Sequence, residues 1–179
     1  FSVLLGRDAE DPEKVREYTR KIAASSQHLL GLINDILDMS KIESGKTSLN
    51  MSQFSLPGLI DELYTMMLPQ ARAKNQEFDL YTKGALPDLL LGDKLRLSQV
   101  LINLLSNAVK YTQDGGHISL TVESLGQNPP NHEHLRFIVA DNGYGMSEGF
   151  MTTIFDPFAR EVTDATREIQ GTGLGMAIT

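Results

Sequence analysis

The sequence predicts an α+β fold in which a long amphipathic helix precedes a sandwich of helices and a sheet. Apolar residues recur every three or four positions from Val15 to Met39, as on one face of a helix. Helical spacing returns over 97–111, whereas residues 117–124 and 135–140 have the pattern of strands. Helices and strands that alternate in this way favour two packed layers after residue 46.

The long helix has clear start and stop signals. Asp11 can cap the first free N–H groups, and Pro12 fits the first turn. Three further apolar residues widen the stripe beyond the seam of a two-stranded coil: Leu30, Ile33 and Leu37. A dimeric four-helix bundle would cover such a stripe, and a helix that covers its own domain is the alternative. Gly45 is placed to end the helix.

The second half of the chain offers further elements in sequence order. We expect a helix over 56–73, a strand over 77–81 and an Asp93 cap before the helix over 97–111. The strands at 117–124 and 135–140 are joined by a polar loop. These elements predict a mainly antiparallel sheet with helices packed against it.

Composition narrows the function classes. The 179 residues carry 16 Lys and Arg against 23 Asp and Glu, a formal charge of −7. This acidic balance argues against a nucleic-acid or acidic-membrane surface. There is no cysteine, and no apolar run approaches the roughly 20 residues of a membrane span. We therefore expect neither nucleic-acid nor membrane contact from this stretch, and a cytoplasmic location.

The helix over 97–111 carries an unusual polar stripe. Asn103, Asn107 and Lys110 are spaced i, i+4 and i+7, roughly opposite an apolar face. That apolar face is made of Leu97, Leu101, Leu104, Leu105 and Ala108. Amide oxygens can complete the shell of Mg²⁺, and a lysine beside them can meet a phosphate. An ordinary solvated face is the alternative.

Two glycine-rich clusters follow. In the first, Asp141 ends an apolar strand and precedes Gly143 and Gly145. The carboxylate can accept a hydrogen bond from a purine amine while the glycines allow close backbone approach, although Asp-Asn-Gly is also ordinary turn material. In the second, residues 171–175 lead into a helix start, where free N–H groups suit phosphates. Neither cluster has Rossmann or P-loop spacing.

The order of these motifs resembles the catalytic core of a sensor histidine kinase from two-component signalling. Four boxes of that family match in order: residues 103–111 the N box, 141–145 the G1 box, 154–160 the F box and 171–175 the G2 box. Residues 29–45 resemble the second helix of the family's dimerisation and phosphoacceptor domain. The ATP-binding part is similar to the Bergerat (GHKL) fold shared with DNA gyrase and heat-shock chaperone ATPases.

The resemblance implies two domains and a homodimer. Residues 1–46 would be a partial dimerisation and phosphoacceptor domain, and 47–179 an ATP-binding domain whose C-terminal part is missing. The dimer would form through residues 12–44. We expect a response-regulator receiver domain as the partner, and the parent protein could be membrane-anchored.

The resemblance also implies ATP and Mg²⁺ as cofactors and assigns roles in the site. Asn107 would ligate the metal, Asp141 would bind the adenine amine, and Asn103, Lys110 and Arg160 would act in catalysis. Phe155 and Phe158 would anchor the base of a lid over 161–170. The remaining positions that would contact the nucleotide are Tyr111, Gly143, Gly145, Gly171, Thr172, Gly173, Leu174 and Gly175.

Asn103 distinguishes two chemistries within the resemblance. Gyrase-like ATPases have at this position a glutamate that activates water, whereas an amide has no useful basicity. Slow hydrolysis and transfer of the γ-phosphate to a neutral histidine nitrogen are therefore expected.

The phosphoacceptor itself departs from the family pattern. In the family, the acceptor histidine lies on the first helix and is followed by an acidic residue and then by Thr-Pro or Asn-Pro. The sequence has four histidines, and none of them fits this pattern: His28, His117, His132 and His134. We infer that Phe1 to Arg7 ends the first helix and that the acceptor histidine lies upstream, from where phosphate passes to a response-regulator aspartate. A non-catalytic nucleotide sensor or dimerisation module is the alternative, and a serine kinase that regulates a sigma factor fits less well.

Overall fold

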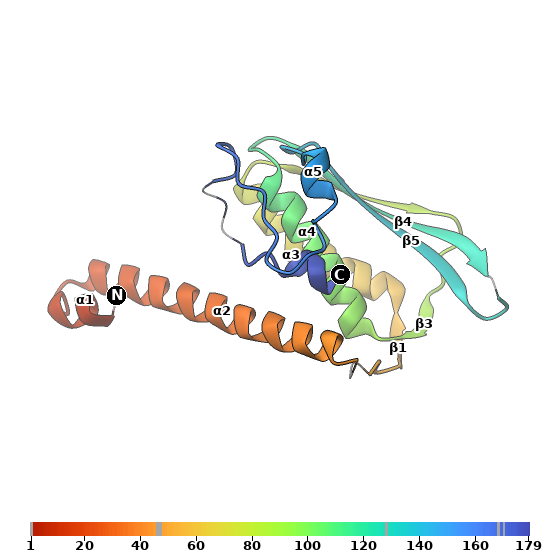
Figure 1. Cartoon of the computed structure of the whole chain (residues 1–179), viewed down its shortest axis with the longest axis horizontal. Helices are drawn as coiled ribbons and strands as arrows, with labels where there is room; N and C mark the ends of the chain where they lie inside the picture. The colour runs from red at the N-terminus through yellow and green to blue at the C-terminus, as the bar shows by residue number, and fades with distance from the viewer. Residues whose placement is uncertain (1, 46–47, 128, 168, 170) are drawn as a thin grey trace. The chain divides into compact units, whose positions relative to one another are not determined.

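The computed structural model describes residues 2–45, 48–127, 129–167, 169 and 171–179. The chain divides into two compact units, Phe1–Lys46 and Thr47–Thr179, each treated by itself below (Figure 1). Within the described residues, none of the helices combines the length and apolar character needed to cross a bilayer.

The first unit is a helical hairpin of α1 (Ser2–Arg7) and α2 (Pro12–Glu43). The predicted start of α2 is confirmed, because the Asp11 carboxylate accepts the N–H groups of Glu13 and Lys14 at 3.1 and 3.2 Å. The end is also as predicted: Gly45 has φ +65°, and its N–H donates to the Ile42 carbonyl.

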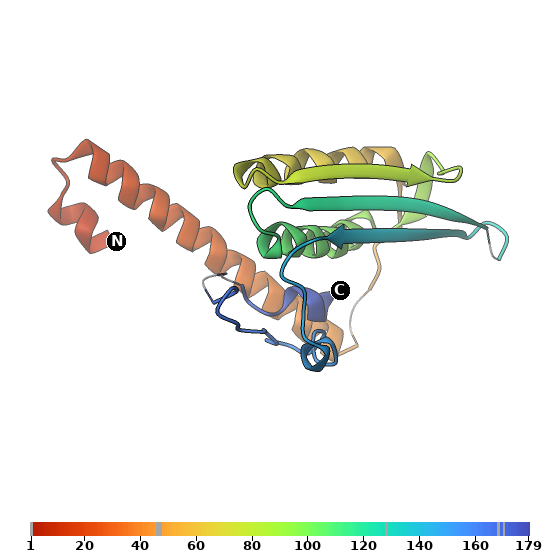
Figure 2. The same ribbon diagram turned by 90° about the horizontal axis from the view of Figure 1, so that it is seen from above.

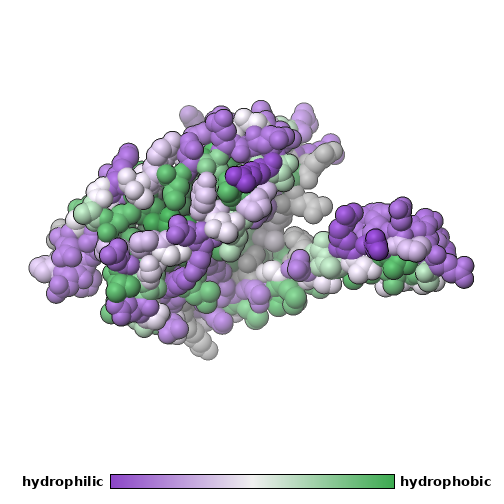
Figure 3. Space-filling view, turned by 180° about the vertical axis from the view of Figure 1, so that it is seen from behind, coloured by the Kyte–Doolittle hydropathy of each residue, from purple (hydrophilic) through white to green (hydrophobic). Residues whose placement is uncertain are grey.

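The apolar stripe of α2 is uncovered within its own unit. Its exposed members are Leu29, Leu30, Ile33, Ile36, Leu37 and Ile42. Figure 3 shows apolar side chains gathered along one side of this helical unit. The helix therefore does not bury its own stripe within the unit that contains it.

The second unit has two layers. Its main sheet has the order β2–β4–β5, formed by Glu77–Lys83, His117–Gln127 and Glu133–Asp141. Strand β2 runs parallel to β4, with Glu77 opposite His117, and β5 runs antiparallel to β4, with Asp141 opposite Ile118. Helices α3 (Leu56–Ala73) and α4 (Lys94–Tyr111) cover one face of this sheet (Figure 2).

The core lies between the two helices and the sheet. Alternate β4 side chains are fully buried, and they meet the apolar stripes of α3 and α4. The largest fully buried residues include Leu59, Leu63, Met67, Leu101, Leu105, Ile118 and Leu120. Four of the five residues predicted for the apolar face of 97–111 belong to or pack against this core, whereas Leu104 is half-buried outside it. The polar stripe of α4 is left for other contacts.

The other face of the sheet carries a polar cluster. The Asp79 carboxylate accepts the Tyr81 hydroxyl at 2.9 Å, and His117 Nε2 lies 3.0 Å from the same oxygen. The hydrogen bond with His117, followed by that from Tyr81, lowers the pKa of Asp79 because both favour the charged carboxylate.

Two strands escaped prediction. Strands β1 (Ser52–Ser55) and β3 (Leu89–Gly92) pair antiparallel as a separate small sheet. Each has four residues, too few for a clear period of two. The main sheet is also mixed rather than mainly antiparallel, and β4 extends further into the loop than expected.

We expect Leu105→Ala to lower the free energy of unfolding by about 2–5 kcal/mol, because it leaves a cavity in the core. Leu95→Ala on the same helix removes a side chain that is 76 % exposed, so its effect should stay within about 0.5 kcal/mol. Urea unfolding followed by circular dichroism measures both. Equal effects would contradict the assigned core face of α4.

Candidate functional site

Helix α4 is fixed at its start by Asp93. The Asp93 carboxylate accepts the N–H of Asn50 at 2.9 Å and that of Arg96 at 3.0 Å. These two bonds, the one from Asn50 first, lower the pKa of Asp93. An ionised carboxylate at the positive helix end stabilises the helix that carries the polar stripe.

Asn103 connects α4 with the second glycine cluster. Its Nδ2 donates to the Gly175 carbonyl at 3.0 Å, at the start of α6 (Gly175–Ile178). The N box and the G2 box, 72 residues apart at this bond, therefore meet in the fold as the motif order predicts. The side-chain amide of Asn103 is thereby oriented by a bond to the main chain.

Asn107 and Lys110 remain available for a ligand. Asn107 is half-buried, and its carboxamide makes no hydrogen bond with any residue that the structure describes. The Lys110 ammonium is exposed and has no ion pair within the described part of the chain. A half-buried amide oxygen without a protein partner, one turn before a free cation, suits a metal-bound phosphate group.

The donor set fits Mg²⁺ better than a metal held by the protein alone. Among the described residues, no three His, Asp or Glu side chains gather to hold a metal. Mg²⁺ usually keeps several waters and binds through one or two protein oxygens together with substrate phosphates. A single amide oxygen from Asn107 is compatible with that mode.

The first glycine cluster lies against the C-terminal end of α4. A Cβ at Gly143 would come 2.3 Å from the Tyr111 carbonyl oxygen, so only glycine allows this approach. The Tyr144 N–H donates to the same Tyr111 oxygen at 3.1 Å. Asp141 is exposed, and its Oδ1 accepts the Gly143 N–H at 2.9 Å. The carboxylate is thus oriented by its own loop while its surface stays open.

Asn142 is a site residue that the sequence argument missed. Its Oδ1 accepts the His117 N–H at 2.8 Å, and its own N–H donates to the His117 carbonyl at 3.2 Å. These two bonds attach the Asp141 loop to the start of β4. Asn142 stands within Asp-Asn-Gly, a sequence typical of turns, so composition gave no separate sign of this role.

The F box and the second glycine cluster also meet through their main chains. The Phe158 N–H donates to the Gly173 carbonyl at 2.9 Å. Gly173 has φ +71°, and a Cβ there would lie 2.7 Å from the Phe158 backbone. Between the glycines, Leu174 is fully buried, and its N–H donates to the Thr172 hydroxyl at 3.1 Å. The conformation of this cluster therefore depends on the absence of a side chain at position 173.

The aromatic rings of the F box, which are expected to anchor the following segment, are exposed in the structure. Phe155 and Phe158 are 62 % and 64 % exposed, so neither ring is packed into a core. The backbone of Phe158 makes the contact instead, because the chain there adopts φ +65° to reach Gly173. The structure thus shows a contact by the backbone of Phe158, and anchoring by the rings stays a prediction.

The segment predicted to be a lid has no helix or strand over 161–167. Arg160 Nη2 donates to the Ile169 carbonyl at 2.6 Å, which bridges the two ends of the segment. The Glu161 carboxylate accepts the Ser147 N–H at the start of α5 (Glu148–Met151). Glu168 and Gln170 lie outside the described residues.

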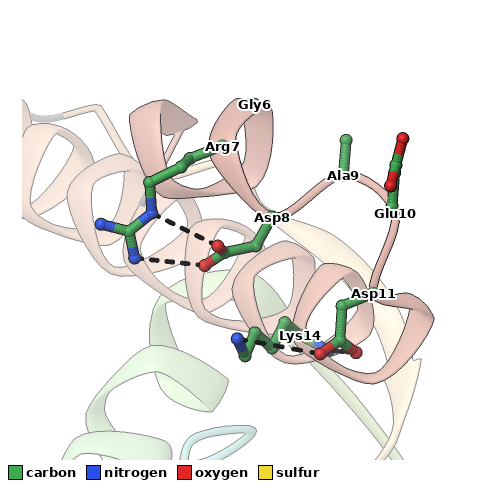
Figure 4. Close-up of a pocket in the computed structure, with 7 residues that line it drawn as sticks. All are labelled: Gly6, Arg7, Asp8, Ala9, Glu10, Asp11 and Lys14. Atoms are coloured by element: carbon green, nitrogen blue, oxygen red, sulfur yellow. Dashed lines mark hydrogen bonds and ion pairs between the residues drawn. The ribbon is translucent and has the colours of Figure 1, made fainter.

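A separate polar hollow lies at the turn between α1 and α2 (Figure 4). Both of its cationic side chains are paired with neighbouring carboxylates, Arg7 with Asp8 at 3.3 Å and Lys14 with Asp11 at 3.8 Å. It contains none of the four boxes. The hollow is therefore a feature of the turn and not the candidate nucleotide site.

The structure places three of the four histidines away from the acceptor pattern. His117 opens β4, His132 lies in the β4–β5 turn with its N–H donating to Pro129, and His134 is exposed on β5. The side chain of His28, on α2, lies outside the described part of the chain.

Comparison with known families agrees with this geometry. Residues 92–179 match the family described as histidine kinase-, DNA gyrase B- and HSP90-like ATPase. Residues 1–45 match the His Kinase A (phospho-acceptor) domain. The chain belongs to the sensor histidine kinases.

Individual relatives of this histidine kinase chain cover both units. The sensor histidine kinase GacS of Pseudomonas protegens is 36 % identical over 178 residues, which are 99 % of this chain and 19 % of GacS. The chain spans about a fifth of the length of the curated relatives it matches. It contains the ATP-binding catalytic core of a sensor histidine kinase.

Solved structures show the same fold. Full-length ShkA in complex with AMPPNP has a TM-score of 0.73 and 32 % identity, covering 91 % of this chain and 32 % of ShkA. The catalytic domain of histidine kinase ThkA has a TM-score of 0.56 and 32 % identity, covering 72 % of this chain and 76 % of that domain. ThkA in complex with the response regulator TrrA has a TM-score of 0.60 and 27 % identity, covering 83 % of this chain and 41 % of ThkA.

We expect Gly143→Ala to break the Tyr144–Tyr111 hydrogen bond, because the new Cβ cannot share space with the Tyr111 carbonyl. The kinase chain should lose about 1–3 kcal/mol of unfolding free energy, and the amide resonances of Tyr111 and Tyr144 should shift. Gly149→Ala is the matched control, since a Cβ there meets nothing within 4 Å. An unchanged spectrum and stability for Gly143→Ala would refute the close approach.

Proposed function

We propose that this chain binds ATP with Mg²⁺ and transfers the γ-phosphate to a histidine that precedes residue 1 in the full-length protein. The phosphate then passes to an aspartate of a response-regulator receiver domain. The observation that carries the proposal is that the four boxes are joined by contacts in the fold. The N box on α4 meets the G2 box through Asn103 and Gly175 and the G1 box through Tyr111 and Gly143, and the F box meets the G2 box through Phe158 and Gly173.

In this proposal, the chain's own groups hold the nucleotide at two ends. The open surface of the Asp141 carboxylate accepts the adenine amine, and Gly143 and Gly145 keep side chains away from the ring. At the other end, the Asn107 oxygen ligates the metal while Lys110 and Tyr111 meet the phosphates. Bound Mg²⁺ supplies charge neutralisation at the phosphates. The backbone of 171–175 supplies N–H groups, and Arg160 serves the terminal phosphate.

Asn103 favours transfer over hydrolysis. Its amide is held by Gly175 and has no basicity with which to activate water. A neutral histidine nitrogen needs no such activation, because it is already nucleophilic near pH 7. A protein acceptor therefore competes well with water for the γ-phosphate.

The exposed stripe of α2 supports a homodimer through residues 12–44. Six large apolar side chains on α2 are uncovered within their own unit, and a second hairpin would bury them in a four-helix bundle. The match of residues 1–45 to the His Kinase A domain and the ThkA–TrrA complex support dimerisation and a receiver-domain partner. Because ATP is the donor, we place the reaction in the cytoplasm.

We expect Asn107→Ala and Asp141→Ala each to weaken ATP binding at least about tenfold, since each removes a charged or metal-mediated contact. Isothermal titration calorimetry with MgATP measures this. Asn34→Ala on α2 and Asp61→Ala on α3 are matched controls that should bind as the parent does. Adding EDTA should weaken binding by the parent but change little for Asn107→Ala. Tight binding by both site variants would overturn the residue assignments.

Phosphotransfer requires a supplied acceptor. We would mix the chain with a separate helical hairpin that carries the acceptor histidine and with γ-labelled ATP, and expect acid-labile label on the hairpin. The same hairpin with that histidine changed to glutamine should stay unlabelled. Bound ATP without any transfer would instead favour a non-catalytic nucleotide sensor.

A further inference from the structure

The C-terminal end of α4 is held by two side chains from outside the helix. The Lys74 ammonium donates to the carbonyls of Val109, Lys110 and Thr112 at 2.9, 3.2 and 2.7 Å. The amide Nε2 of Gln76 donates to the Val109 and Thr112 carbonyls at 3.1 and 2.7 Å. We call Lys74 and Gln76 the α4 cap.

The α4 cap comes from the junction between α3 and β2, and that junction is itself fixed. Asn75 turns the chain with φ +52°, a conformation that asparagine tolerates. The Lys74 carbonyl accepts the Gly115 N–H at 3.0 Å, and the Glu77 N–H donates to Gly116 at 2.9 Å. The α4 cap therefore projects from a segment whose backbone is held by hydrogen bonds.

Every carbonyl of the last turn of α4 thus has a partner. Ala108 accepts the Thr112 N–H, Tyr111 accepts the Tyr144 N–H, and the α4 cap serves Val109, Lys110 and Thr112. Helix ends usually leave such groups to water. Here the turn that bears Lys110 and Tyr111 is tied to α3, to β2 and to the Asp141 loop at once.

We propose that Lys74 and Gln76 are positioning residues for nucleotide binding, acting through the main chain of α4. This inference rests on the proposed function of Asn107, Lys110 and Tyr111. A helix C-terminus carries partial negative charge, which disfavours a nearby polyphosphate. The Lys74 ammonium offsets that charge, and the two donors together hold the backbone from which Lys110 and Tyr111 project.

The contribution of Gln76 to stability does not explain why position 76 is a glutamine. The residue is only 5 % exposed, and its Oε1 has no hydrogen-bond partner among the described residues. A buried polar oxygen without a partner costs free energy. Gln76 Nε2 reaches three carbonyls. Those of Val109 and Thr112 also accept the Lys74 ammonium, and that of Gln113, 3.4 Å away, also accepts the Gly116 N–H, so leucine could replace Gln76 without leaving any of them unpaired. A role in holding the last turn of α4 in position would explain the buried amide.

The test compares MgATP affinity with melting temperature in the whole chain. Lys74→Met should weaken binding about tenfold, whereas Lys74→Arg, which restores a charged donor, should stay within about threefold of the parent. Gln76→Leu should weaken binding about threefold with no loss of melting temperature. The double variant Lys74→Met with Gln76→Leu should lose more affinity than the two single losses combined, because either donor can serve Val109 and Thr112.

Two control variants make the same kinds of substitution at residues outside the α4 cap. Lys83→Met changes an exposed strand lysine, and Gln70→Leu changes an exposed glutamine on α3. Both should bind MgATP as the parent does. Parent-like affinity in the double variant, measured at a temperature where it is fully folded, would overturn the inference.

Nuclear magnetic resonance of the nucleotide-free chain distinguishes the two proposals. Lys74→Met should shift the amide resonances of residues 110–113 and 144. If the parent binds no MgATP but these shifts occur, the proposed function fails while the positional effect of the α4 cap stands. If the parent binds and the shifts are absent, the cap inference fails alone.

Discussion

The carbonyl oxygen of Tyr111 is the contact on which the arrangement of the site depends. It accepts the Tyr144 N–H, and it lies where any side chain at position 143 would have to be. This one contact sets the distance between the end of α4 and the loop of Asp141. Because the two ends of the proposed nucleotide site come from these two elements, their spacing cannot change without breaking the contact.

Helix α4 combines stability and recognition in one element. Its buried side, which includes Leu101 and Leu105, packs into the core between the sheet and α3. Its polar side carries Asn103, Asn107 and Lys110. Because a helix is rigid over this length, tight packing on one side fixes the positions of the groups on the other. The hydrophobic core therefore also serves as the scaffold of the proposed site.

The sequence predicted the parts of the molecule that depend on local pattern. The bounds of α3, the start of α2 at Asp11 and the meeting of the four boxes follow from periodicity, capping residues and motif order. Strands β1 and β3 were not predicted, because the paired residues lie between 34 positions (Ser55 and Leu89) and 40 positions (Ser52 and Gly92) apart and each strand is too short to show a period of two. The Asn142 and Lys74 contacts were missed for a related reason. Each contact joins a side chain to a main-chain group that is distant in the sequence. A single sequence contains no local pattern that predicts such a pairing.

The site differs in rigidity from one side to the other, and this difference has a chemical consequence. The α4 side is fixed by core packing and by main-chain hydrogen bonds. On the other side, the segment over 161–167 has no helix or strand, and the F-box rings before it are exposed. Its contacts include hydrogen bonds from Arg160 to the Ile169 carbonyl and from the Ser147 N–H to Glu161. A phosphate donor must be held firmly at the adenine and the metal, yet its γ-phosphate must be reached by a histidine from another domain. Core packing on the α4 side and a segment without helix or strand on the other meet both requirements. In the proposed function, Arg160 exchanges the Ile169 carbonyl for a phosphate, and this exchange leaves the core undisturbed because the Arg160–Ile169 bond lies on the surface.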